Sequence, residues 1–251
     1  MRQVLERSTE DNDLDVAALR RAPRAALSGS TSGTAGMGAL TAVGAAAEPR
    51  NSAAEILRAA ADAFMLKGFA ATSTDDVAHR LGCTKGRIYH HYRSKVDLFF
   101  AVHLEAMSMV AREVIAAGAD VRDPIHRLFC MSRAHVLVIM REISFQCVVV
   151  QGLEMHLHGQ TTPPQRETLR DILAQRDEYE QLFSRAIDEA LATGLLPEQE
   201  TRVVVKALLG ALNWTTLWYR PRNDEIEAER LAMAEEVATF CVRGLGGKHG
   251  R

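Results

Sequence analysis

The segment at residues 79–95 gathers cationic, histidine and tyrosine side chains and contains no carboxylate. This composition is typical of a surface that meets phosphate groups. Arg87 has the planar fork of donors that can bind a guanine edge with two hydrogen bonds. Lys85, Tyr89 and Lys95 are suited to phosphate oxygens, which position a protein on DNA without reading its bases. The alternative interpretation is a solvated basic face without a partner.

Two short helices must present these side chains. Ser73, followed three residues later by Asp76, forms a capping box, so a helix is expected over 74–81. Gly82 ends that helix, and Thr84 can cap a second one over 85–92. Two short helices within about 20 residues have the spacing of a helix-turn-helix, whose second helix enters the major groove.

The second helix has an inner and an outer face. Ile88 and Tyr92 lie four residues apart and are expected to point inward. Gly86 has no side chain and lets the backbone approach DNA closely. The residues that we expect at DNA are Ser73, Thr84, Lys85, Gly86, Arg87, Tyr89, His90 and Lys95.

The chain after Pro49 has apolar residues every three or four positions and few alternating segments, which predicts an all-α fold. A first helix is expected over 51–67, ended by Gly68, and a fourth helix begins after Ser94. Pro124 and the Pro163-Pro164 pair mark further boundaries. The helices expected beyond residue 120 are 124–142, 145–156, 164–192, 198–219 and 224–242.

The densest part of this pattern, residues 54–99, resembles the DNA-binding domain of the TetR family of bacterial regulators. Two departures stand out: Tyr92 replaces the family's usual Phe, and Arg87 stands where a small or aliphatic residue is more usual, so base contacts are individual to this chain. The resemblance is carried by Gly68-Phe69-Ala70-Ala71-Thr72-Ser73, Asp75-Asp76-Val77-Ala78 and Gly82-Cys83-Thr84-Lys85-Gly86-Arg87-Ile88-Tyr89-His90-His91-Tyr92-Arg93-Ser94-Lys95.

Composition and this resemblance together divide the chain into three regions. Residues 1–49 are rich in small and charged residues that cannot offset the entropy of ordering, so a disordered extension is expected. Residues 50–97 correspond to the helix-turn-helix domain. Residues 98–246 correspond to a larger helical domain that binds a small-molecule effector and forms a homodimer through its last two long helices. The implied DNA partner is a palindromic double-stranded operator.

A weaker resemblance lies at residues 213–221, which contain both tryptophans of the chain. This stretch is similar to the end of the penultimate helix in TetR proteins that sense acyl-CoA thioesters in fatty-acid or sterol breakdown. The tryptophans could instead only pack a dimer interface, and the effector could instead be a drug or xenobiotic that releases an efflux operon. The ligand-binding residues expected are Phe145, Val149, Arg176, Tyr179, Phe183, Trp214, Trp218 and Arg220.

Other functional classes have little support in the sequence. Glu154, His156 and His158 are interpreted as a polar helix end, and four scattered cysteines form no Cys-x-x-Cys pair, so we expect neither metal nor cofactor. No nucleophile and base have a recognisable spacing, so we do not expect an enzyme, although an all-helical enzyme and a ligand-free architectural DNA binder remain alternatives.

Charge and hydropathy limit the environment. The net charge of -2 argues against a uniformly basic nucleic-acid coat protein. The longest aliphatic runs fall far short of the roughly 20 residues that span a bilayer, and charge interrupts the N-terminus before a signal peptide could form. A cytoplasmic protein without a membrane partner is therefore expected.

Overall fold

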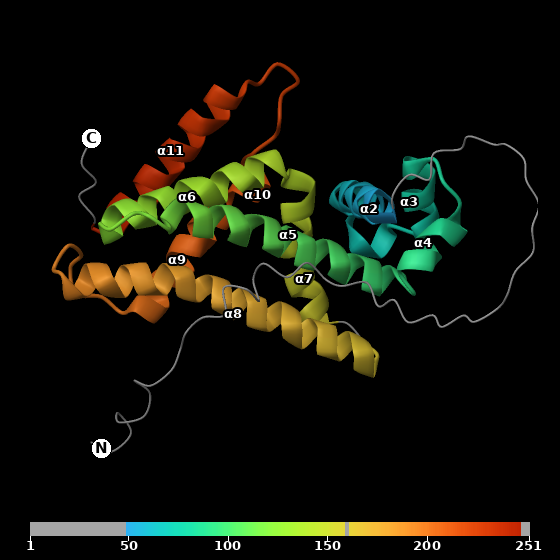
Figure 1. The fold of residues 1–251 in the computed structure, drawn as a ribbon, viewed down its shortest axis with the longest axis horizontal. Coiled ribbons are helices and arrows are strands. Elements are labelled where there is room, and N and C mark those ends of the chain that lie inside the picture. Colours follow the sequence, from blue (N-terminus) through green and yellow to red (C-terminus); the bar gives the residue numbers. More distant parts are fainter. Residues whose placement is uncertain (1–48, 159–160, 247–251) are drawn as a thin grey trace, which may run out of the picture.

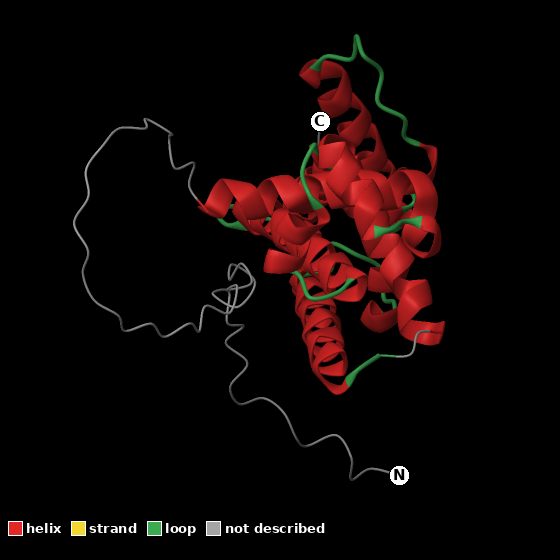
Figure 2. Ribbon diagram, turned by 90° about the vertical axis from the view of Figure 1, so that its right-hand side faces the viewer, coloured by secondary structure: helices red, strands yellow, loops and turns green. Residues whose placement is uncertain are grey.

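All regular structure that the computed structural model describes, in residues 49–158 and 161–246, is α-helical (Figures 1 and 2). The all-α prediction is confirmed. The predicted disorder of residues 1–49 concerns almost only residues outside the described ranges, although Pro49 already begins a helix.

Three helices form a head at one end of the molecule, on the right of Figure 1: α2 (Pro49–Ala71), α3 (Thr74–Leu81) and α4 (Lys85–His91). The apolar stripe of α2 is buried, with Ile56, Ala60 and Phe64 fully inaccessible. Gly68 has a φ of 74°, a conformation that disfavours other residues, and it interrupts α2 where the sequence predicted a stop.

Four longer helices follow: α5 (Lys95–Gly118), α6 (Pro124–Arg141), α7 (Ile143–His158) and α8 (Pro163–Ala192). Helix α5 runs from the head into the body and packs against α6, α7 and α8, while α7 also packs against α2. One apolar core therefore joins α2, α3, α4, α5 and α7, and a second core joins α6 and α8 to the last helices.

The C-terminal helices are α9 (Thr201–Asn213), the single turn α10 (Thr215–Trp218) and α11 (Glu227–Gly244). The prediction of one continuous helix over 198–219 is wrong. Gln199 instead donates to the carbonyl of Leu245, and the hydroxyl of Thr216 donates to the carbonyl of Asn213 where α9 ends. Such long-range and local competitors for backbone groups move helix boundaries.

The last helix also begins later than the predicted residue 224. Tyr219, Glu225 and Arg230 form a hydrogen-bonded group that holds the preceding loop, with Arg230 Nε 2.9 Å from the carboxylate of Glu225. The side chain of Glu225 is only 1% exposed, so its carboxylate is shielded from water, whereas Arg230 is 25% exposed. The loop is therefore fixed by side chains rather than by helical hydrogen bonds.

No single helix in the described ranges is both long and apolar enough to cross a membrane. Helix α6 and the first part of α7, Ile143–Gly152, are long and apolar enough only when taken together, and the two segments are bent by 102° relative to each other.

Candidate DNA interface and effector region

The helix-turn-helix forms as its capping residues predict. Ser73 Oγ accepts from the amide of Asp76 at 3.1 Å, and the Asp76 carboxylate accepts from the amide of Ser73 at 2.8 Å. Gly82 ends α3 with a φ of 66°, which allows the sharp turn into α4. Hydrogen bonds from Lys67 and Ser73 hold the pKa of Asp76 well below its usual range, so the cap is ionised at neutral pH.

Helix α4 presents its cations to solvent. Ile88 is buried, whereas the side chains of Lys85 and Arg87 are 46% and 41% exposed. Each cation is held by a carboxylate of the same head: Lys85 Nζ lies 2.8 Å from Asp75, and Arg87 Nη2 lies 3.1 Å from Glu55. These acidic partners were not predicted from the sequence, since neither lies on α4.

The remaining residues expected at DNA lie around these two cations. Tyr89 is 45% exposed, and its hydroxyl is 3.3 Å from that of Thr74. Thr84 stands at the N-cap position of α4, but its side chain makes no capping hydrogen bond. Gly86 and His90 are exposed on the same short helix, and no side chain of the head encloses Gly86. The outer face of α4 is thus accessible along its length.

Lys95, expected at DNA, makes contacts within the head. Its ammonium group donates to the carbonyls of Phe69 and Ala70, at 2.9 and 3.2 Å, and lies 4.4 Å from the centre of the Phe69 ring. These contacts close the C-terminal end of α2 onto the start of α5. Lys95 therefore stabilises the head whether or not it also meets a phosphate.

Helix α7 connects the head to the body. Arg58 of α2 lies 2.6 Å from the Glu142 carboxylate and 4.9 Å above the ring of Phe145. Further along α7, Gln151 donates to the carbonyl of Phe64 at 3.1 Å. A shift of α7 would therefore displace α2 through these contacts.

A buried polar group lies in the body, between α6, α8 and α9. Because the Asn213 oxygen accepts from Nε2 of His135 at 3.1 Å, the other ring nitrogen accepts from the hydroxyl of Tyr179 at 2.5 Å. Burial lowers the pKa of His135 to about 4 and raises that of Tyr179. Both side chains are therefore neutral at pH 7, and Phe183 packs against both rings.

The residues expected to bind the effector do not all come together. Tyr179 and Phe183 lie in the core of the body, and Phe145 lies in the core shared with the head, while Val149 packs between these cores. Arg176 is half-buried on α8. The remaining three are at the surface: Trp214 is 62% exposed, Trp218 is 44% exposed, and Arg220 is also exposed.

The expected grouping of Phe183 with the two tryptophans is not formed. Both tryptophans fall within the continuous helix predicted over 198–219, but the chain breaks at Trp214, between α9 and α10. Phe183 is completely inaccessible, whereas both indoles face solvent. His103 of α5, which is buried, was not predicted as a site residue from the sequence.

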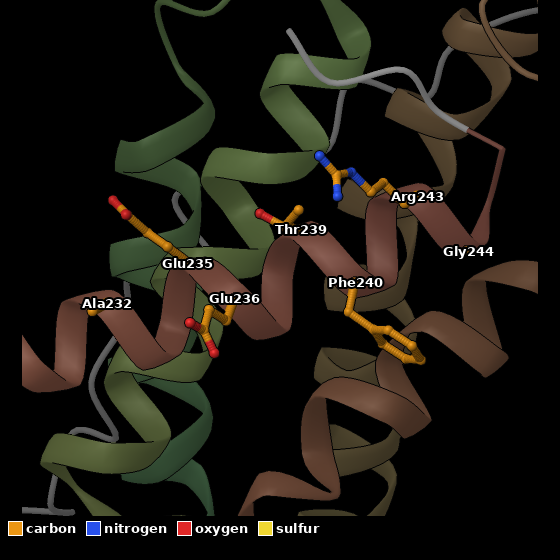
Figure 3. Close-up of a pocket in the computed structure, with 7 residues that line it drawn as sticks. All are labelled: Ala232, Glu235, Glu236, Thr239, Phe240, Arg243 and Gly244. Atoms are coloured by element: carbon orange, nitrogen blue, oxygen red, sulfur yellow. The ribbon is translucent and has the colours of Figure 1, made fainter. Parts of the chain in front are cut away.

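The last helices expose several apolar side chains, and a groove with a mixed polar and apolar lining follows α11. The most exposed of these side chains is Phe240, at 76%. The groove has a volume of about 760 Å³, and Figure 3 shows Glu236 and Phe240 on the same side of α11. The exposed apolar residues of α9, α10 and α11, with the loop before α11, are Val203, Trp214, Leu217, Trp218, Ile226, Leu231 and Phe240.

Within the described ranges, no three side chains of His, Cys, Asp or Glu lie close enough together to bind a metal ion. The side chains of Glu154, His156 and His158 lie outside what the structure describes. All four cysteines are free thiols, and burial raises the pKa of Cys130, Cys147 and Cys241. These three thiols are therefore protonated at neutral pH.

Comparison with known proteins agrees with the two-part architecture. Residues 56–102 match the family model for bacterial regulatory proteins of the tetR family, and residues 121–245 match the tetracyclin repressor-like C-terminal domain. The repressor KstR2 of Rhodococcus jostii strain RHA1 is 35% identical over 200 residues, which cover 78% of this chain and 91% of that protein.

Solved structures share the fold. PfmR from Thermus thermophilus is 28% identical with a TM-score of 0.61, and the match covers 78% of this chain and 96% of that one. AibR, solved with isovaleryl coenzyme A and operator DNA, is 25% identical with a TM-score of 0.62, and the match covers 77% of this chain and 97% of that one. The chain belongs to the TetR family of ligand-responsive transcriptional repressors.

Proposed function

We propose that this protein is a homodimeric repressor that binds a palindromic operator and is released from it by an acyl-CoA thioester. The main support for this proposal is the similarity of the chain to AibR over nearly the whole length of AibR. AibR was solved with both isovaleryl coenzyme A and operator DNA. The resemblance of residues 213–221 to acyl-CoA-sensing regulators supports the same ligand class. A repressor of this kind works in the cytoplasm, where the chromosome lies.

On the DNA side, α4 is the reading helix of the proposal. Its exposed Arg87 can donate two hydrogen bonds to a guanine edge, and Lys85 and Tyr89 flank it toward the phosphates. Ser73, Thr84, Gly86 and His90 complete the surface that would face the groove. Binding requires the carboxylates of Glu55 and Asp75 to release or share their cations.

The outer face of α9 and α11 is proposed as the dimer seam. A second copy related by a two-fold axis would cover the exposed Phe240 and Trp214 and fill the groove along α11. Two identical heads would then face half-sites of a palindrome, spaced by whole turns of DNA. The tryptophans can serve this seam as well as an effector, so their assignment to ligand rests on the sequence resemblance.

The effector is proposed to act in the body, among residues of α7 and α8. Phe145 and Val149 belong to the helix that contacts α2, and Arg176, Tyr179 and Phe183 lie along α8. A ligand that spreads these helices would move the head through Arg58 and Gln151. Arg176 and the exposed Arg220 are the cations proposed for the coenzyme A phosphates.

A gel shift on the DNA upstream of the protein's own gene tests DNA binding and ligand class together. The full chain should retard this fragment but not a scrambled one, and long, branched or ring-bearing acyl-CoA thioesters should release it. Free coenzyme A and the free acids should act weakly, since each supplies only part of the contacts. If hydrophobic cations release the DNA and thioesters do not, the proposal is wrong, and the protein instead represses an efflux operon in response to drugs or xenobiotics.

A further inference from the structure

One histidine in the effector region has an unsatisfied nitrogen. His103 of α5 is 3% exposed, and its Nε2 has no hydrogen-bond partner among the described residues. The carbonyl of Val148 accepts a hydrogen bond from this imidazole, so Nδ1 is the donor. Burial, together with the nearby charge of Arg176, lowers the pKa of His103 to about 4. At neutral pH, Nε2 is therefore an acceptor without a donor, an arrangement that costs about 1 to 3 kcal/mol.

The ring of His103 leaves no room for a side chain on α7 at the position opposite it, which is occupied by Gly152. A Cβ atom at Gly152 of α7 would lie 2.6 Å from Nδ1 of His103 and 2.9 Å from Cε1, too close for any side chain. Glycine weakens a helix interior by about 1 kcal/mol relative to alanine. Its presence inside α7 thus allows α5 to place an imidazole directly against the backbone of α7.

Two further groups surround this contact. Gln151, the neighbour of Gly152, has a buried Oε1 that also lacks a hydrogen-bond partner among the described residues, while its amide nitrogen is bound to the head at Phe64. Helix α8 packs on α5 (Figure 1), and the positive charge of its half-buried Arg176 lowers the pKa of His103. Two unsatisfied acceptors, His103 Nε2 and Gln151 Oε1, therefore lie on or against α7, the helix that packs on α2, and the charge of Arg176 acts on His103.

We propose that His103, Gly152 and Arg176 form a polar subsite for the effector, where Nε2 of His103 accepts a hydrogen bond from a ligand hydroxyl or amide N–H and Arg176 binds a ligand anion. The inference rests on the proposed function and narrows its ligand class. The ligand must combine an apolar body, a neutral hydrogen-bond donor and a negative charge. Acyl-CoA thioesters meet these requirements through their amides and phosphates, and hydroxylated fatty acids meet them without coenzyme A.

The direct test is the ¹⁵N resonance of His103 Nε2 in the full-length protein, recorded with three probes: dodecanoyl-coenzyme A, 3-hydroxydodecanoic acid and methyl dodecanoate. A hydrogen bond to a bare imidazole nitrogen shifts its resonance, so at least one of the first two probes should move it. Methyl dodecanoate carries neither donor nor anion and should not. No shift with either donor-bearing probe, or an equal shift with the methyl ester, would overturn the inference.

Operator release, measured in the same samples, keeps the two proposals apart. Release by dodecanoyl-coenzyme A without a shift at His103 would remove the subsite and leave the proposed function standing. A shift and release with the hydroxy acid alone would support the subsite and remove the acyl-CoA assignment. Thus each proposal can fail without the other.

Variants add a control for folding. His103→Leu should raise the probe concentration for half-release about tenfold, and His103→Gln, which restores an acceptor, should recover much of the response. Gly152→Ala should also blunt the response about tenfold because its Cβ displaces the imidazole. Ala116→Ser, at an exposed position of α5, the helix that also carries His103, is the control and should respond as the parent. A normal response in both His103→Leu and Gly152→Ala would contradict the subsite.

Discussion

The ammonium group of Lys85 on α4 lies 2.8 Å from the carboxylate of Asp75 on α3. The hydrogen bond to Asp75 raises the pKa of Lys85, so the cation is present at any physiological pH. If Lys85 binds an operator phosphate as proposed, that phosphate must compete with the carboxylate of Asp75 in the same head.

Removing this competitor should strengthen DNA binding. Asp75→Asn is expected to raise operator affinity about threefold to tenfold, and to steepen the plot of log affinity against log salt by up to about one unit. Fluorescence anisotropy over a range of salt concentrations measures both. Asp224→Asn makes the same charge change at a carboxylate that is 88% exposed, far along the chain, and is the control. Unchanged or weaker binding by Asp75→Asn would contradict this competition.

Arg87 should carry base preference. Arg87→Ala is expected to cost about 1 to 3 kcal/mol on the preferred operator, and much less on random DNA, because a bidentate contact to a base is lost. Lys95→Met should instead lower affinity for all sequences alike and also lower thermal stability, since Lys95 holds the carbonyls of Phe69 and Ala70. Equal losses on cognate and random DNA for Arg87→Ala would show that Arg87 only contacts phosphates.

Local signals in the sequence predicted the head well. Ser73, Gly68 and Gly82 mark boundaries through their own backbone preferences, so these boundaries were predictable without knowledge of the rest of the fold. The late start of α9 depends on a distant partner, since Gln199 donates to the carbonyl of Leu245, and Asn213 at the other end of α9 accepts from His135 of α6. No local pattern contains that information.

The same distinction applies to the site. The cations of α4 were identified from their composition, whereas their partners Glu55 and Asp75 lie on other helices. His103 has no motif around it, and its importance emerges only when α5 meets Gly152 of α7. The only signal in the sequence is a glycine inside an otherwise apolar helix, which by itself has many explanations.

Stability should depend on pH through two buried histidines. His103 and His135 have a pKa of about 4 in the folded protein, against an ordinary value of 6.5. Their neutral forms face Arg176 in one case and Tyr179 with Asn213 in the other. Between pH 6.5 and 4 the unfolded chain binds protons that the native state does not, so stability falls as pH falls, by up to roughly 3 kcal/mol per histidine.

Urea denaturation at pH 7.5 and 5.0 measures this effect. The loss of unfolding free energy on acidification should be smaller in a double variant with His103→Gln and His135→Gln, since the carboxylates titrate alike in both proteins. An identical loss in the parent and the double variant would show that the histidines do not carry it.

The dimer seam can be broken at one exposed side chain. Phe240→Asp should convert the protein to a monomer at micromolar concentration, because it places a charge where two apolar faces would meet. Sedimentation velocity reports the mass. Leu66→Asp is the control, because Leu66 is 64% exposed but lies on α2, away from α9 and α11. A parent protein that already sediments as a monomer would refute the seam.

The central claim is that an acyl-CoA thioester and operator DNA oppose each other through one protein. Linkage requires that the thioester weaken operator binding by the same factor by which the operator weakens thioester binding. The decisive measurement is therefore the dissociation constant of isovaleryl- or dodecanoyl-coenzyme A for the full chain, with and without saturating operator. The account predicts equal factors of about 5 to 150 in both directions. Thioester affinity that is unchanged by bound operator would contradict it.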